Sequence, residues 1–228
     1  MKKYILLGIP LILYGNSLLF YFRNIHSYMS SILEVLMNLS ILLVCMIFLL
    51  KRTKLQNALD WLIGLSFSIY FCILYFNTIH FLFFLDDLHY SVETLKYISN
   101  SVNLVPIKGI IDVLRYNPSS LFQIAGNTIM LTPLAFAMLY FKWAKSNKQA
   151  IWYSFLCTIG IELIQFLQSI LALVFNLGMG RSLDVDDVLL NTIGAVIGVG
   201  CYFIWVKIET FFSFKKKNFQ VSIHDKRS

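Results

Sequence analysis

Residues 30–50 read SSILEVLMNLSILLVCMIFLL, and the basic pair Lys51-Arg52 follows directly. The second half of this run, residues 41–50, has no polar side chain beyond the thiol of Cys45. A helix needs about 20 predominantly apolar residues to cross the hydrocarbon core of a bilayer. The run therefore predicts a membrane-spanning helix that ends at a basic, water-facing connection.

Five further runs have a similar length and polarity, and they lie at about residues 4–22, 61–85, 121–141, 149–174 and 186–206. The composition agrees, because 58% of the 228 residues are hydrophobic and only 14% are charged, whereas soluble domains carry about 25% charged residues. Lipid offers no water to an open backbone, so each run must be helical. The sequence predicts an all-α polytopic bundle of about six transmembrane helices.

Lysine and arginine are distributed unevenly between the connections. Fourteen of the 19 fall on the side of the N-terminus and five on the other side. Because cytoplasmic connections carry the excess of Lys and Arg, we expect a multi-pass protein of the cell membrane with both termini in the cytoplasm. The first run lacks a small-x-small cleavage site, so we expect it to be retained as a span.

Two connecting segments differ from the rest. The long stretch 86–120 falls outside in this topology, and we expect short interfacial helices there, interrupted at Pro106; a passive connector is the alternative. The basic tail, residues 211–228, either rests on anionic lipids of the inner leaflet or is disordered. We favour disorder for this tail.

Polar side chains gather in the outer half of every predicted span. Glu34 and Asn38 open the second run, for example, and His80 lies late in the third, whereas the inner halves of the second, fourth and sixth runs are almost wholly apolar. Charge at membrane depth costs about 2.5–3.5 kcal/mol on the lenient scale, so such groups usually face the interior of a bundle. We expect one outward-facing polar pocket that is closed toward the cytoplasm, which argues against a simple pore.

The densest polar cluster spans the fifth and sixth runs, and its members share helix faces: Thr158, Glu162, Gln165 and Ser169 on the fifth, and Asp184, Asp187 and Asn191 on the sixth. Arg181 is the natural counter-ion for Glu162 or Asp184. Asp184 or Asp186 is placed to cap the sixth helix. These groups either contact a ligand or fix the register of the helices, and both interpretations stay open. The spacing Gly194-x-x-x-Gly198 predicts close helix packing.

Several kinds of site have no support in the sequence. His80 and His89 lack acidic partners at a metal-ligand spacing, and the four cysteines lie singly inside apolar runs. No Gly-rich phosphate loop or HExxH motif is present. The net charge of +7 comes from short clusters between spans rather than from a stripe. We expect no cofactor, no metal and no nucleic-acid partner.

Four stretches together resemble the VanZ-like membrane family. They are Asn103-Leu104-Val105-Pro106-Ile107, the run from Asn127 through Met130-Leu131-Thr132-Pro133-Leu134-Ala135-Phe136, Ile161-Glu162-Leu163-Ile164-Gln165, and the run from Arg181 to Gly194. The chain departs from the family where Thr132 precedes the proline and Ala135 precedes Phe136. Their order and spacing cover residues 101–206.

The resemblance implies a bacterial cell-envelope protein of Gram-positive type, since the family is named for a protein that gives low-level teicoplanin resistance. It implies three parts: a two-helix N-terminal segment 1–60, a VanZ-like core 61–210 and a basic cytoplasmic tail 211–228. The candidate ligand-binding residues that match the family pattern are Asn127, Glu162, Gln165, Arg181, Asp184, Asp187 and Asn191. No chemical role comes with them.

Three functions compete. The favoured one is binding, in which the outer pocket engages a lipid-linked envelope precursor or a lipoglycopeptide, with membrane lipids as surroundings. The second is an intramembrane enzyme that acts on a lipid headgroup through Glu162, Asp184 and Asp187, although no nucleophile supports it and no catalytic residue is assigned. The third is a transporter, which the apolar inner half disfavours.

Overall fold

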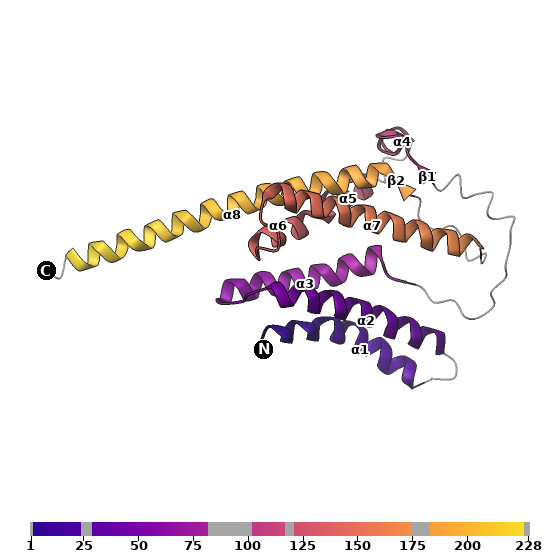
Figure 1. Cartoon of the computed structure of the whole chain (residues 1–228), viewed down its shortest axis with the longest axis horizontal. Coiled ribbons are helices and arrows are strands. Elements are labelled where there is room, and N and C mark those ends of the chain that lie inside the picture. Colours follow the sequence, from indigo (N-terminus) through magenta and orange to yellow (C-terminus); the bar gives the residue numbers. More distant parts are fainter. Residues whose placement is uncertain (1, 24–28, 82–101, 117–120, 175–182, 226–228) are drawn as a thin grey trace.

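A computed structural model describes residues 2–23, 29–81, 102–116, 121–174 and 183–225, with side chains up to Phe212. It is built from helices and one small strand pair (Figure 1): the 3₁₀ helix η1 (Lys2–Leu7), α1 (Gly8–Phe22), α2 (Met29–Arg52), α3 (Ala58–Thr78), β1 (Val102–Asn103), α4 (Lys108–Tyr116), α5 (Leu121–Met130), α6 (Thr132–Tyr140), α7 (Asn147–Val174), β2 (Leu183–Asp184) and α8 (Val185–Asp225).

Six helical stretches in this described part are long and apolar enough to cross a membrane: Lys2–Phe22, Met29–Arg52, Ala58–Thr78, Leu121–Tyr140, Asn147–Val174 and Val185–Phe212. Large apolar side chains on their outer faces are exposed, such as Leu62 and Phe76 on α3 and Leu163 on α7. In a soluble protein such faces would be an aggregation hazard, whereas in a bilayer they contact lipid. The predicted all-α membrane bundle is confirmed.

The helices form two groups (Figure 1). In the first, α1, α2 and α3 enclose an apolar cluster around Leu42 and Tyr75. In the second, α5, α6, α7 and α8 pack together, and Leu131 and Ala137 lie in a cluster that α3 also joins through Phe67. Both ends of the chain lie at one end of the bundle, and the β1–β2 pair lies at the opposite end. We call these the terminal end and the strand end.

The fourth span is not one continuous helix. It breaks at Leu131 between α5 and α6, and Pro133 occupies the first turn of α6. Proline lacks a backbone donor and favours a helix start. The Tyr70 hydroxyl donates to the Met130 carbonyl oxygen at 2.7 Å, so the break does not leave that carbonyl without a partner. The expectation of a single helix over residues 121–141 is therefore wrong at Leu131.

Two glycines of α8 allow a close contact with the fourth span. A Cβ on Gly194 would lie 2.2 Å from the Thr128 carbonyl oxygen of α5, and one on Gly198 would lie 2.3 Å from the Thr132 carbonyl oxygen of α6. Thr132 Oγ1 also donates to the Gly194 carbonyl oxygen at 2.9 Å. The two glycines let the backbones of α8 and the broken span touch, so the predicted packing role of this pair is confirmed.

The last helix extends well past the bundle at the terminal end (Figure 1). Its helical structure continues through Asp225, so the expectation of a disordered tail is wrong for residues 213–225. The polar composition of this stretch indicates that it lies outside the membrane. It does not indicate disorder, because the stretch also contains good helix formers.

Candidate functional site

The strand end brings together two sequence motifs that lie far apart in the chain. Strands β1 and β2 pair in parallel, with Val102 opposite Leu183 and Asn103 opposite Asp184. This ladder ties the segment around Pro106 to the start of α8. Two-residue strands carry no recognisable periodicity, and the pairing was not predicted.

Asp184 joins three elements at the start of α8. Its Oδ1 accepts hydrogen bonds from the Asp186 backbone N–H and from Asn103 Nδ2, each at 2.9 Å. The first bond is the N-cap that the sequence predicted. The Asp184 backbone N–H donates to Oε2 of Glu162 on α7 at 3.3 Å, and Glu162 is only 2% exposed. Glu162 and Asp184 are therefore neighbours, as expected.

Asp186 holds the start of α4. It is 2% exposed, and its two carboxylate oxygens accept from the backbone N–H groups of Ile107 and of Ile110, the latter at 3.2 Å. Ile107 directly precedes α4 and Ile110 lies in its first turn, where backbone N–H groups have no partner within the helix and a negative charge is favourable. Asp186 thus caps a neighbouring helix, a role that the sequence did not reveal.

Gly109 makes this capping contact possible. A Cβ at Gly109 would lie 3.0 Å from Asp186 Oδ2 and 3.1 Å from Asp184 Oδ2, which is closer than ordinary van der Waals contact. A glycine three residues after a proline was the signal in the sequence for a close backbone approach. It was not included among the predicted site residues.

Asp187 and Asn191 reach different neighbours from the same side of α8. Asn127 of α5 donates its side-chain amide to Asp187 Oδ1. Asn191, which is 1% exposed, donates to Thr158 Oγ1 of α7 at 3.0 Å. The polar faces of α7 and α8 therefore meet, as predicted, and α8 also reaches α5. Within the described part of the chain, Asn191 Oδ1 has no hydrogen-bond partner.

Gln165 turns toward α3. Its Nε2 donates to the Thr78 carbonyl oxygen at 3.1 Å, and Gln168 donates to the carbonyl oxygens of Ile79 and His80, both at 3.1 Å. These bonds satisfy carbonyls that the end of α3 leaves open. The side chain of Gln165 therefore bonds α3 and not the start of α8. Arg181, the predicted counter-ion, lies outside the described residues.

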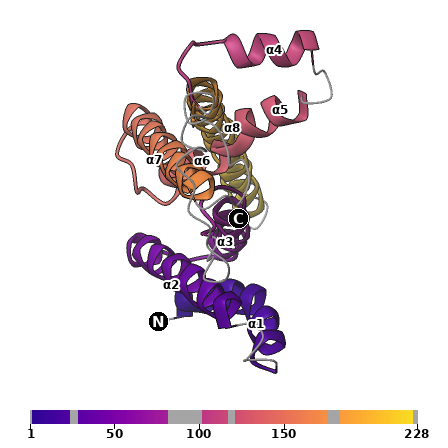
Figure 2. The same cartoon turned by 90° about the vertical axis from the view of Figure 1, so that its right-hand side faces the viewer.

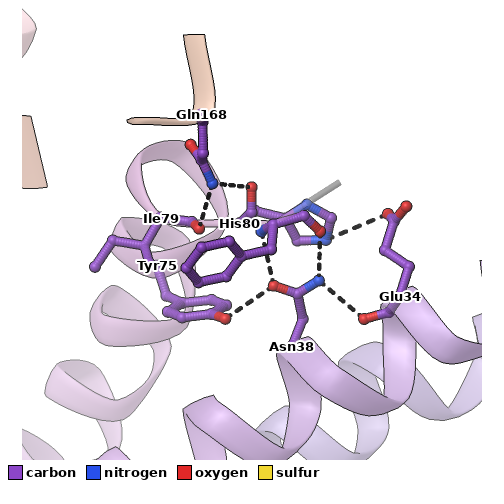
Figure 3. Close-up of polar contacts among 7 residues, drawn as sticks. Glu34, Asn38, Tyr75, Ile79, His80 and Gln168 are labelled. Carbon is purple, nitrogen blue, oxygen red and sulfur yellow. Dashed lines mark hydrogen bonds and ion pairs between the residues drawn. The ribbon is translucent and has the colours of Figure 1, made fainter. Parts of the chain in front are cut away.

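Asn38 fixes the same end of α3 from the other side (Figure 3). Its side chain donates to the carbonyl oxygens of Glu34 at 2.9 Å and Phe81 at 2.7 Å, and accepts from the Tyr75 hydroxyl at 2.8 Å and the Phe81 N–H at 2.9 Å. All four hydrogen-bonding positions of this buried amide are used.

His80 lies just beyond the end of α3 and faces Glu34 of α2 (Figure 3). Its Nε2 is 3.8 Å from Glu34 Oε1. Burial lowers the pKa of His80 below its usual value, and the Glu34 carboxylate opposes this shift. The lowered pKa favours the neutral ring near pH 7.

The segment that Asp186 holds carries an apolar surface. Leu104, Val105, Ile107, Leu114 and Tyr116 are each more than half exposed. In Figure 2, α4 lies beside α5 and α8, on the side away from α1, α2 and α3. The predicted short helix after Pro106 is confirmed; its contact with the outer leaflet stays a prediction.

The carboxylates at the strand end are distributed over separate partners. Asp184 bonds β1, Asp186 bonds α4 and Asp187 bonds α5. Within the described ranges, no three His, Cys, Asp or Glu side chains converge in the way that metal ligands do. The three acids and their partners form a polar, hydrogen-bonded layer, here called the polar floor, next to the apolar 104–116 segment.

Comparison with known proteins gives one result. The sequence model of the VanZ/LLP1 family matches residues 67–206, from the middle of α3 to α8. No match was found among curated proteins or among solved structures. The matched region contains every residue of the strand-end site on α5, α7 and α8, and it leaves out α1 and α2. Because it spans more than half of the chain, this multi-pass membrane protein belongs to the VanZ/LLP1 family.

Proposed function

We propose that this protein binds a lipid-linked envelope molecule or a lipoglycopeptide at the outer surface of the bacterial cell membrane and thereby contributes to glycopeptide (teicoplanin) resistance. The observation that carries the proposal is the joining of two surfaces. The exposed apolar segment 104–116 is bonded to a polar start of α8 through Asp184 and Asp186.

A lipid-linked ligand presents the same two features. Its acyl part favours an apolar surface at the level of the lipid headgroups, which Leu104, Leu114 and Tyr116 provide. Its head is rich in hydroxyl and amide groups, which carboxylate and carboxamide side chains recognise by hydrogen bonds. Glu162 and Asn127 belong to the polar part of the site.

Binding is favoured over catalysis by the way in which the carboxylates are used. Asp186 has both oxygens on backbone N–H groups, and Asp184 caps its own helix and accepts from Asn103. Such bonds hold a recognition surface in one shape, and pre-formed polar groups are what a binding site requires.

The test uses a deletion strain complemented with variants at equal membrane abundance. Glu162→Gln changes the polar floor, and Leu104→Ser with Leu114→Ser changes the apolar surface. Lys145→Gln, an exposed position at the terminal end that lines neither proposed site, is the control. We expect the first two variants to be as sensitive to teicoplanin as the deletion strain and the control to behave as wild type.

Unchanged susceptibility in both test variants would refute the proposal. Lipid profiles of the same strains address the alternative function. A lipid species that changes on deletion, returns with the wild-type protein and fails to return with Glu162→Gln would indicate an enzyme acting on a lipid headgroup instead.

A further inference from the structure

A second candidate site lies at the terminal end of the bundle. A hollow of about 660 Å³ opens between the start of α3, the end of α6 and the stretch of α8 around residue 205. Its lining includes Arg52, Lys54, Tyr140, Lys142, Trp205 and Glu209. We propose that this hollow binds the phosphate headgroup of an anionic phospholipid.

The charge of the hollow favours an anion. Arg52, Lys54 and Lys142 line it together. The acid Asp60 is already satisfied, because it accepts from the backbone N–H groups of Gln56 at 2.7 Å and Asn57 at 3.3 Å and from the Tyr140 hydroxyl at 2.7 Å. Glu209 is the second acid in the lining, so three cations face two acids and the hollow keeps an excess of positive charge.

Trp205 supplies a donor that the described residues do not use. Its indole N–H is buried and has no acceptor among them. Its ring packs edge-on against Phe136 and Tyr140, with centroids 6.3 Å and 6.0 Å away. A buried donor without a partner costs about 1–3 kcal/mol. An oxygen of a bound headgroup that accepts from this N–H would remove that cost.

Lys142 lines the hollow from an unusual backbone conformation. Its φ of 57° lies in the left-handed region, where glycine or asparagine is the usual occupant after a helix. The turn is fixed by bonds from the Lys142 N–H to the Leu139 carbonyl and from the Ala144 N–H to the Met138 carbonyl. A strained residue persists where the surroundings over-determine it, and such residues cluster at ligand sites.

The position of the hollow favours a lipid over a soluble phosphate compound. The spans that border it end at Arg52 and Tyr140, and Trp, Tyr, Lys and Arg are the residues enriched at the bilayer interface. Phe203 and Ile204 of α8 are 50% and 61% exposed beside Trp205. Acyl chains can therefore lie along α8 while the phosphate enters the hollow.

The experiment measures binding of short-chain phosphatidylglycerol to the full chain in a neutral detergent, by native mass spectrometry and by thermal shift. The variants are Lys142→Gly and Trp205→Phe. The matched control is Lys145→Gln with Lys148→Gln, two exposed lysines nearby that do not line the hollow. Inorganic phosphate at the same concentration is the second probe.

Lys142→Gly separates a binding role from a structural one. It relieves the strained φ, so the free protein should melt at or above the wild-type temperature, yet it removes a cation and should weaken lipid binding about fivefold. Trp205→Phe keeps a ring and should also weaken binding. The control variant should bind as wild type, and inorganic phosphate should not compete.

Three results would overturn the proposal. Wild-type affinity in Lys142→Gly and Trp205→Phe would show that the hollow does not hold the headgroup. An equal loss in the control would show that only the general basic charge of this end matters. Displacement of the lipid by inorganic phosphate would identify a site for a soluble phosphate compound instead.

Discussion

Replacing Gly194 by alanine tests the close contact between α8 and α5. The added Cβ would lie 2.2 Å from the Thr128 carbonyl oxygen, where ordinary van der Waals contact begins at 3.4 Å. The obstacle is backbone rather than a flexible side chain, so α8 and α5 must separate by about 1.2 Å. The same separation strains the 2.9 Å bond from Thr132 Oγ1 to the Gly194 carbonyl.

The cost has two parts. Overpacking of a well-packed interface costs about 1–3 kcal/mol, and losing one neutral hydrogen bond costs about 0.5–1.5 kcal/mol. The helix propensity of alanine returns roughly 0.5–1 kcal/mol. We expect Gly194→Ala to destabilise the protein by about 1–3 kcal/mol, which corresponds to a loss of several degrees in Tm for a chain of this length.

Gly200→Ala is the matched control, because it lies on the same helix and a Cβ there would meet nothing within 4 Å. Both variants are purified in the same detergent, and unfolding is followed by intrinsic fluorescence on heating. The control should melt at or slightly above the wild-type temperature. Equal Tm values for Gly194→Ala and Gly200→Ala would refute the close backbone contact between α8 and α5.

Three further predictions concern the ends of α3. Asn38→Ala leaves buried hydrogen-bonding groups unpaired and should destabilise the protein by at least about 2 kcal/mol. The control Asn77→Ala loses a single exposed bond and should melt close to the wild-type temperature. Equal Tm values for the two variants would contradict this prediction. Asn57→Ala removes the capping box and should cost about 1 kcal/mol in the same assay. The folded-state pKa of His80 is lowered, so the unfolded chain takes up the proton more readily. Stability should therefore fall as the pH drops through about 6.5 and level off below the folded pKa. Glu34→Gln should lower that pKa further and enlarge the fall in Tm between about pH 7.5 and about pH 5.5. A His80 resonance that titrates above its usual pKa would contradict this reasoning.

The spans were predictable because lipid imposes a simple rule on sequence. Any run of about 20 apolar residues must be helical to pair its own backbone, and all six such runs became helical spans, the fourth in two pieces. The break at Leu131 was missed although Thr132-Pro133 offered a signal, since a proline inside an apolar run either kinks a helix or starts a new one. Composition alone does not separate those outcomes.

The contacts of the site were predictable only in part. Helical spacing shows which residues share a face, and the predicted faces that carry Thr158 and Asn191 do meet. It does not show which neighbour a face meets when a helix touches several. Gln165 lies on the same predicted face as Glu162, yet it bonds α3 whereas Glu162 bonds the start of α8. Only the tertiary arrangement decides this.

The acids at the start of α8 also bear on whether this cluster fixes register or contacts a ligand. The two oxygens of Asp186 accept from Ile107, which precedes α4, and from Ile110 in its first turn, so its role is to hold the 104–116 segment. A carboxylate is suited to this because it accepts two backbone donors at once and compensates the positive end of a helix. An apolar residue at position 186 would leave those donors unpaired and release the segment. Under the proposed function, Asp186 holds the surface in one shape, and Glu162 and Asn127, which are bonded to Asp184 and Asp187, supply the polar contacts to the ligand.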